Sequence, residues 1–312
     1  MNPPTIAHLP LPSGLRSRAL RRDIAGYLAI SPWLIGFLAF QVFPLLLAIY
    51  LCFVDWTYTG APVWVGLGNF REMFSAELFY KSLGNTAYYT FIAVGLQVGT
   101  ALIAALAVNQ KIHAVNFYRF AFYLPSIVPS VGVAYLWMWI YNPEFGLLNA
   151  VLRSVGLPGQ RWLYEPSMAK MAYIFMSLWG IGGGMVIFLA GLQGIPDLLY
   201  EAAEIDGAGR WSKFWNVTIP MLSPIIFFNL VMNVIGSFQI FTAAYLMTAG
   251  SPQNSTLFYV LYLYRSAFED IRFGYASALA WALFLIILGF TLLQFKLSGR
   301  WVYYESEGDT AR

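Results

Sequence analysis

The chain has 312 residues, of which 59% are hydrophobic and only 11% are charged, and its mean hydropathy is +0.62. Soluble domains carry about 25% charged residues, so this composition excludes a soluble globular protein and indicates a polytopic membrane protein. The small, dispersed net charge of +3 argues against a nucleic-acid partner, and the single cysteine, Cys52, excludes an internal disulfide and a multi-cysteine metal site.

Six apolar stretches are each long enough to cross a bilayer, which takes about 20 mostly apolar residues. They cover residues 24–54, 85–108, 120–141, 171–192, 221–247 and 275–295. We therefore expect an all-α fold with about six transmembrane helices. The domain boundaries that follow are a polar tail (1–23), a transmembrane domain (24–298) and a second tail (299–312).

The positions of the basic residues predict the orientation of these spans. Eleven of the 18 Lys and Arg residues fall on the side of the N-terminus. Four of them directly precede the first span: Arg16, Arg18, Arg21 and Arg22. Because basic residues concentrate on the cytoplasmic side of a membrane protein, both termini are expected to be cytoplasmic. The polar segment 195–220, between the fourth and fifth spans, is then cytoplasmic as well.

The segment 195–220 has a pattern that predicts more than a connecting loop. Pro196 predicts a helix start, and Gly207 predicts the end of that helix, because glycine readily adopts the left-handed conformation found there. A second short helix is expected from about residue 209 to Pro220, where the fifth span begins. Acidic residues dominate the polar face, which favours a protein partner with basic groups; an amphipathic helix that rests on lipid is the alternative.

Polar and small residues within two predicted spans are candidates for a translocation path, because polar groups at membrane depth usually face a cavity or the interior of the helix bundle. Four in the fifth span share one helix face: Asn229, Asn233, Gly236 and Ser237, with Gln239 following. The fourth span contributes Trp179, Gly180 and Gly183. The alternative role for these residues is close packing and hydrogen bonding between helices. The middle of each span lacks charged residues, which favours a neutral, hydroxyl-rich solute over an ion.

The segment 195–220 resembles the EAA loop of ABC importer permeases. The matching residues are Glu201-Ala202-Ala203, Asp206-Gly207-Ala208, Phe214, Ile219-Pro220 and Pro224. Further matches to the carbohydrate-uptake branch, the maltose- and glycerol-3-phosphate-type permeases, are Gly66-Leu67-Gly68-Asn69-Phe70 and Thr248-Ala249-Gly250-Ser251-Pro252. Ser251 stands where a glycine is common, and Ala243 stands where many relatives carry an acid. The resemblance covers nearly the whole chain.

The resemblance implies a MetI-like permease subunit of an ATP-driven, binding-protein-dependent importer for a di- or oligosaccharide, in the cytoplasmic membrane of a bacterium or archaeon. The implied partners are a second homologous permease, two ATPase subunits, an extracellular solute-binding protein, the sugar and membrane lipid. The resemblance implies that Glu201, Ala202, Ala203, Asp206, Gly207, Ala208, Phe214, Ile219 and Pro220 couple to the ATPase.

The chain itself is expected to be neither an enzyme nor a cofactor-binding protein. It lacks a GxxxxGK[ST] phosphate loop, so ATP and Mg²⁺ are expected on the partner ATPase. Its two histidines, His8 and His113, have no metal-binding or catalytic spacing, so no catalytic and no metal site is expected. A stand-alone carrier or channel for a small neutral polar solute is the alternative function, although it leaves the segment 195–220 unexplained.

Overall fold

The chain folds almost entirely into helices. The computed structural model describes residues 13–57, 60–110 and 112–303, and within them the strands are limited to β1 (Val54–Asp55) and β2 (Val63–Trp64), which pair antiparallel. Four described helices are long and apolar enough to cross a membrane, and the number rises to six if each of two bent helix pairs counts as one span. The prediction of an all-α protein with about six spans is therefore confirmed.

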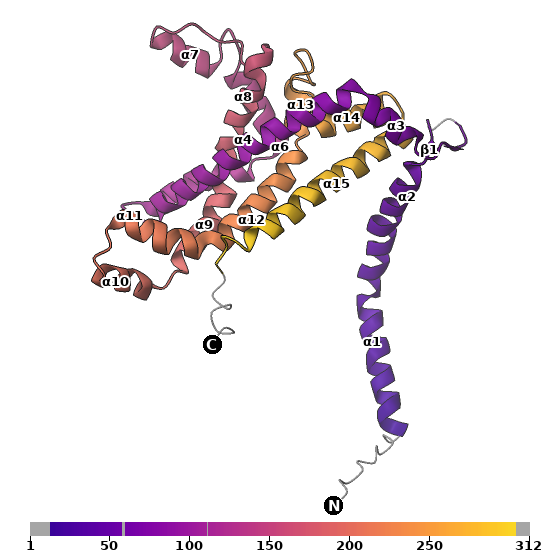
Figure 1. Ribbon diagram of the computed structural model, residues 1–312, viewed down its shortest axis with the longest axis horizontal. Coiled ribbons are helices and arrows are strands. Elements are labelled where there is room, and N and C mark those ends of the chain that lie inside the picture. Colours follow the sequence, from indigo (N-terminus) through magenta and orange to yellow (C-terminus); the bar gives the residue numbers. More distant parts are fainter. Residues whose placement is uncertain (1–12, 58–59, 111, 304–312) are drawn as a thin grey trace, which may run out of the picture.

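The first span stands apart from the rest of the described chain (Figure 1). It is a continuous rod made of α1 (Ser13–Phe37), the π turn η1 (Leu38–Val42) and α2 (Phe43–Leu51). None of its most apolar window is buried inside the chain, and the rod meets the other elements chiefly where α2 packs against α15 and β1. Its surface is therefore free to contact lipid or another subunit.

The central helix is α4 (Glu77–Val108), which follows the short α3 (Gly68–Ser75). It starts at Glu77, whereas the predicted span starts at residue 85. The prediction started later because the first two turns of the helix carry the charged residues Glu77 and Lys81, which a hydropathy criterion leaves out. α4 packs against α8, α9, α12 and α14 and supplies many of the buried side chains. It is the element around which the other spans are arranged.

The predicted spans 120–141 and 171–192 are bent pairs of helices. The first pair bends by 100° and the second by 46°. The pieces of the first are α5 (Val115–Tyr123), η2 (Leu124–Ile127) and α6 (Ser130–Ile140); those of the second are α8 (Pro166–Ser177), η3 (Leu178–Gly180) and α9 (Gly182–Gln193). Pro129 explains the first bend, because a residue before proline is held extended, and Val128 has a ψ of 131°.

The segment 195–220 forms two helices, as predicted, but the second does not end at Pro220. α10 (Asp197–Ile205) is followed by α11 (Arg210–Lys213), the π turn η4 (Phe214–Thr218), α12 (Ile219–Phe238) and α13 (Thr242–Met247). Pro220 lies within a continuous helix because the π turn precedes it, with the N–H of Ile219 bonded to the carbonyl of Phe214. The wider turn accommodates a residue that has no N–H to donate.

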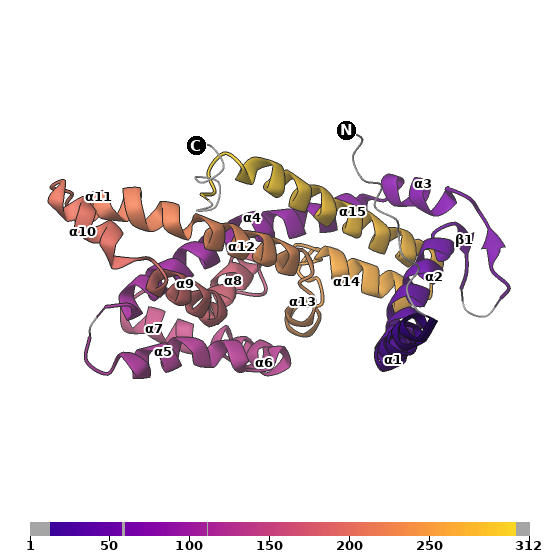
Figure 2. The same cartoon turned by 90° about the horizontal axis from the view of Figure 1, so that it is seen from below.

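The remaining helices are α7 (Leu147–Ser154), α14 (Tyr259–Tyr264), the π turn η5 (Arg265–Glu269) and α15 (Phe273–Ser298). Three tyrosines are fully buried in the core, and the hydroxyl of each has a partner: Tyr141 donates to the Ala172 carbonyl, Tyr259 to that of Leu279, and Tyr173 pairs with Thr248. Figure 2 shows α10 and α11 at one end of the molecule and β1 with α3 at the other.

Candidate functional site

The turn between α10 and α11 is closed by the hydrogen bonds of a Schellman motif. The N–H of Gly207 donates to the Glu204 carbonyl at 3.0 Å, and the N–H of Ala208 donates to the Ala203 carbonyl at 2.9 Å. Gly207 has a φ of +78°, and nothing lies within 4 Å of the position that a Cβ would take. Its backbone conformation, and not crowding, is what makes glycine suitable there.

Two side-chain contacts hold α10 against the following helix. Lys213 forms an ion pair of 2.5 Å with Glu204, and the hydroxyls of Tyr200 and Thr218 are 3.0 Å apart. The ammonium group of Lys213 lowers the pKa of the Glu204 carboxyl below its ordinary value, chiefly through their hydrogen bond. These contacts tie the turn to the start of the long helix.

The helix pair presents a large apolar surface, which we call the loop surface. Its most exposed side chains are Leu198 (72%), Ile205 (88%), Trp211 (73%) and Trp215 (59%). The ring of Phe214 lies between the two tryptophans, with ring centroids 5.8 Å from Trp211 and 5.1 Å from Trp215. Contiguous exposed apolar side chains of this size are typical of an interaction surface.

The predicted coupling residues are grouped on this helix pair, with two exceptions. Glu201, Ala202, Asp206 and Gly207 are exposed, and Ala203, Ala208 and Phe214 are half-buried. Ile219 and Pro220 lie beyond the π turn, in the first turn of α12.

Three neighbouring cavities lie along α4: the first two are lined by α12, and the third by the bent third and fourth spans and residues 240–243. Their volumes are about 100, 280 and 310 Å³. Gln97 and Asn233 line the first two, Tyr89 and Ile240 line the second and third, and Ser177 and Gly180 line the first and third. The shared residues show that they are neighbours, and we call them together the polar cavities. Among the described residues that line them, none is Asp, Glu, Lys or Arg.

Two asparagines of α12 line the smallest cavity. The side-chain amide of Asn229 donates to the backbone carbonyl of Ile225 at 3.0 Å. That of Asn233 donates to the backbone carbonyl of Asn229 at 2.8 Å. The Oδ1 atom of Asn229 is 3.3 Å from the position that a Cβ on Gly184 would take. Each amide donates one of its two protons within the helix, so the other proton and the side-chain oxygen remain to bond a solute or water.

Most of the predicted path residues line the polar cavities. Those that do are Trp179, Gly180, Asn229, Asn233, Gly236 and Ser237. Gly183 does not line them, and Gln239 is exposed and donates its amide to the Ile235 carbonyl at 3.1 Å. Sequence reasoning missed Gln97 and Tyr89 on α4 and Ser177 on α8. Gln97 could have been found, because it is an amide inside an apolar span.

The described residues contain no cluster of three or more His, Cys, Asp or Glu side chains that could hold a metal ion. The candidate site consists of the exposed loop surface and the uncharged polar cavities, joined by the helix that runs from Arg210 into α12.

Comparison with known proteins connects this arrangement to a transport family. Residues 97–302 match the family model described as "Binding-protein-dependent transport system inner membrane component". The chain is 44% identical over 298 residues to the "Probable ABC transporter permease protein YesP" of Bacillus subtilis (strain 168), covering 94% of this chain and 96% of that protein. It is 30% identical over 291 residues to the "Arabinooligosaccharides transport system permease protein AraP" of the same organism, covering 92% of each.

A solved structure extends the similarity to the fold. It is the crystal structure of a bacterial ABC transporter involved in the import of the acidic polysaccharide alginate, and one of its chains has a TM-score of 0.79 at 25% identity. The match covers 91% of this chain and 98% of that one. The expected MetI-like fold is thereby confirmed. This chain belongs to the family of binding-protein-dependent transport system inner membrane components, and it is a multi-pass permease subunit of an ABC transporter rather than an enzyme.

Proposed function

We propose that this chain forms half of the translocation path of an ATP-driven importer for a neutral di- or oligosaccharide. A second homologous permease supplies the other half, two ATPase subunits drive transport, and an extracellular solute-binding protein delivers the sugar. The observation that carries the proposal is that one helix, α11 to α12, has the loop surface at one end and the polar cavities along its length. An element of this kind suits a protein that transmits motion from a docked partner to a transport path.

The loop surface is proposed to dock on the ATPase subunit, with both termini of the chain on the same, cytoplasmic side. The exposed carboxylate of Glu201 would pair with a basic residue of the ATPase. Ala202 and Ala203 are small enough to allow close approach, and Gly207 makes the turn that brings Trp211 beside α10. ATP and Mg²⁺ then bind to the ATPase subunits and not to this chain.

The polar cavities are proposed to hold part of the sugar path. Amide and hydroxyl groups from Gln97, Asn233 and Ser237 suit hydroxyl-rich solutes, and the ring of Trp179 offers an apolar face for a sugar ring. The absence of charge among the described lining residues favours a neutral sugar. The substrate class named for AraP, arabinooligosaccharides, supports an oligosaccharide. Alginate, named for the solved structure, is an acidic polysaccharide and supports a saccharide but not its neutrality.

Co-purification tests the docking role. The chain is co-expressed with its partner permease and ATPase, and the bound ATPase is measured for wild type, Glu201→Lys and Glu144→Lys. Glu144 is exposed on the loop between α6 and α7, so its substitution controls for the change of charge. We expect Glu201→Lys to lose the ATPase and Glu144→Lys to retain it. Retention by both variants contradicts the docking role, and sugar uptake by the chain alone in liposomes would favour a stand-alone carrier.

A further inference from the structure

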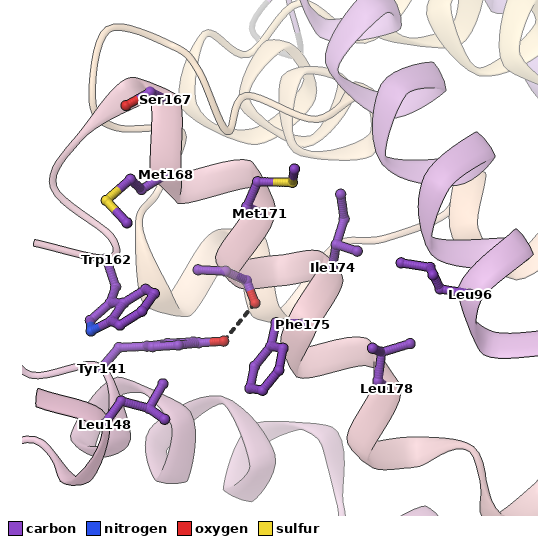
Figure 3. Close-up of a pocket in the computed structure, with 11 residues that line it drawn as sticks. Leu96, Tyr141, Leu148, Trp162, Ser167, Met168, Met171, Ile174, Phe175 and Leu178 are labelled. Carbon is purple, nitrogen blue, oxygen red and sulfur yellow. Dashed lines mark hydrogen bonds between the residues drawn. The ribbon is translucent and has the colours of Figure 1, made fainter. Parts of the chain in front are cut away.

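An apolar groove of about 460 Å³ runs along the side of α8 that faces away from the polar cavities. Its floor is a stripe at helical spacing: Met171, Ile174, Phe175 and Leu178. Figure 3 shows Leu96 of α4 on one side of this stripe and Tyr141, Leu148 and Trp162 on the other. The residues of α8 that line the polar cavities, Met176 and Ser177, lie on its other face. The groove is therefore separate from the proposed sugar path.

A cation lies beside this groove, between α8 and α4. Lys170, next to Met171, places its Nζ atom 4.8 Å from the centroid of the Tyr88 ring and 3.3 Å from Oδ1 of Asn85. The hydroxyl of Tyr88 in turn donates to the sulfur of Met171 at 3.6 Å, so the ring and the cation lie next to a side chain that lines the groove. Within the described chain, no carboxylate lies within ion-pair distance of Lys170. Among the described residues, its ammonium group contacts a neutral amide and a ring face.

The dimensions of the groove match one leaflet of a bilayer. Met168 and Leu178, which both line the groove, are ten residues apart on α8 and η3, which corresponds to about 15 Å along a helix axis. One leaflet of the hydrocarbon core is about 15 Å thick. Trp162 donates its indole N–H to Asn149 at 2.9 Å, which leaves its ring face toward the groove. Aromatic rings and lysines at the end of an apolar surface are typical of the boundary between hydrocarbon and headgroups.

We propose that this groove binds an anionic phospholipid, with an acyl chain along Met171, Ile174 and Leu178 and the headgroup phosphate on Lys170. The positive charge without an acidic partner selects an anionic over a zwitterionic headgroup, and the apolar floor takes the chain. A basic residue near the membrane surface contributes about 1 kcal/mol to the binding of anionic lipid, which is about fivefold in affinity. The site is independent of the sugar path and of the loop surface.

Native mass spectrometry of the full chain tests the headgroup. Binding of phosphatidylglycerol is compared with that of phosphatidylcholine with the same acyl chains, for wild type, Lys170→Gln and Arg161→Gln. Arg161 is the matched control, because it is an exposed cation near the same end of α8 whose guanidinium lies over Tyr164. We expect wild type and Arg161→Gln to prefer phosphatidylglycerol, and Lys170→Gln to lose about fivefold of that preference. Equal binding of both lipids by wild type overturns the proposal.

Photolabelling of the same chain in nanodiscs tests the groove. Phosphatidylglycerol with a diazirine in its acyl chain should label peptides from α8 and the Leu96 region of α4, and Ile174→Trp, which fills the groove, should reduce that labelling. Circular dichroism and elution volume verify that the variant is folded. Labelling confined to other helices overturns the proposal. Loss of labelling on assembly with the partner permease also overturns it, because the groove would then be a contact between subunits.

Discussion

Glu72 and Arg272 are 200 positions apart in the sequence, and a hydrogen bond of 2.6 Å joins their side chains. The pair connects α3 to the residue that precedes α15, and the guanidinium of Arg272 also lies 4.7 Å from the centroid of the Tyr275 ring. The bond to Arg272 lowers the pKa of the Glu72 carboxyl below its ordinary value of 4.5. The contact therefore fastens two distant parts of the chain in a way that depends on pH.

The first prediction concerns acid stability. Because the pKa of Glu72 is lower in the folded chain than in the unfolded one, the stabilisation is fully present above about pH 4.5 and is lost as the pH falls through the folded-state pKa. Both side chains are substantially exposed, so the contribution is expected to be below about 1 kcal/mol. Melting temperatures of wild type and Glu72→Gln in detergent, measured from pH 7 to pH 3, should converge at low pH. Glu77→Gln, at a carboxylate with no ion pair to another described residue, serves as the control.

The second prediction concerns the turn between α10 and α11. Gly207→Ala forces a residue with a Cβ into a φ of +78°, at a cost of about 1 kcal/mol. Gly209→Ala introduces the same methyl group two residues later, where φ is −72° and nothing lies within 4 Å of the added atom. In a titration with the ATPase subunit, Gly207→Ala is expected to bind several-fold more weakly, while Gly209→Ala matches wild type. Equal weakening by both would mean that the methyl group itself, and not the turn, disturbs docking.

The third prediction separates two neighbouring glycines of α9. A Cβ on Gly184 would lie 3.3 Å from both Asn229 Oδ1 and Ala101 Cβ, at the smallest polar cavity, whereas a Cβ on Gly183 meets nothing within 4 Å. One added methyl group in a fitted site changes a rate by about tenfold or more. Sugar uptake by the assembled transporter should therefore fall for Gly184→Ala and remain unchanged for Gly183→Ala. Both changes favour the helix, so lost helicity cannot account for a difference.

The fourth prediction concerns the attachment of the first span. The amide of Asn69 donates to the carbonyls of Cys52 at 3.0 Å and Val54 at 2.9 Å, all three being buried. Asn69→Ala leaves both carbonyls without this donor and is expected to destabilise the chain by about 1–3 kcal/mol. Asn216→Ala removes an exposed amide that bonds only within its own helix, to Ser212, and should have little effect. Unfolding in increasing denaturant compares the two, and equal midpoints would contradict the prediction.

Local signals in the sequence predicted the helix pair of segment 195–220 well. Pro196 and Gly207 act on the residues beside them, so the start of α10 and the turn after it follow from single positions. The same reliance on a single position gave a wrong prediction at Pro220, because a proline considered alone predicts a helix end. The π turn that keeps the helix intact depends on the packing of the residues around it.

The composition of the polar cavities was less predictable. Asn229 and Asn233 share a face on one helix, which periodicity reveals, but Gln97 and Tyr89 join them from α4. Which face of α4 meets which face of α12 is decided by contacts between residues more than a hundred positions apart. The bend after Val128 likewise brings α6 beside α13, a contact that a straight third span would not suggest.

The π turn at Phe214–Thr218 has a mechanical consequence. A helix broken at Pro220 would act as two segments with a joint at the membrane surface, and movement of Arg210 could be absorbed there. With the π turn the helix is continuous through Pro220. Arg210 and Asn233 therefore belong to the same helix, about 35 Å apart at 1.5 Å per residue. A continuous helix can convert a tilt or a rotation at one end into a displacement at the other, so we expect a partner that binds Trp211 to move the asparagines as well.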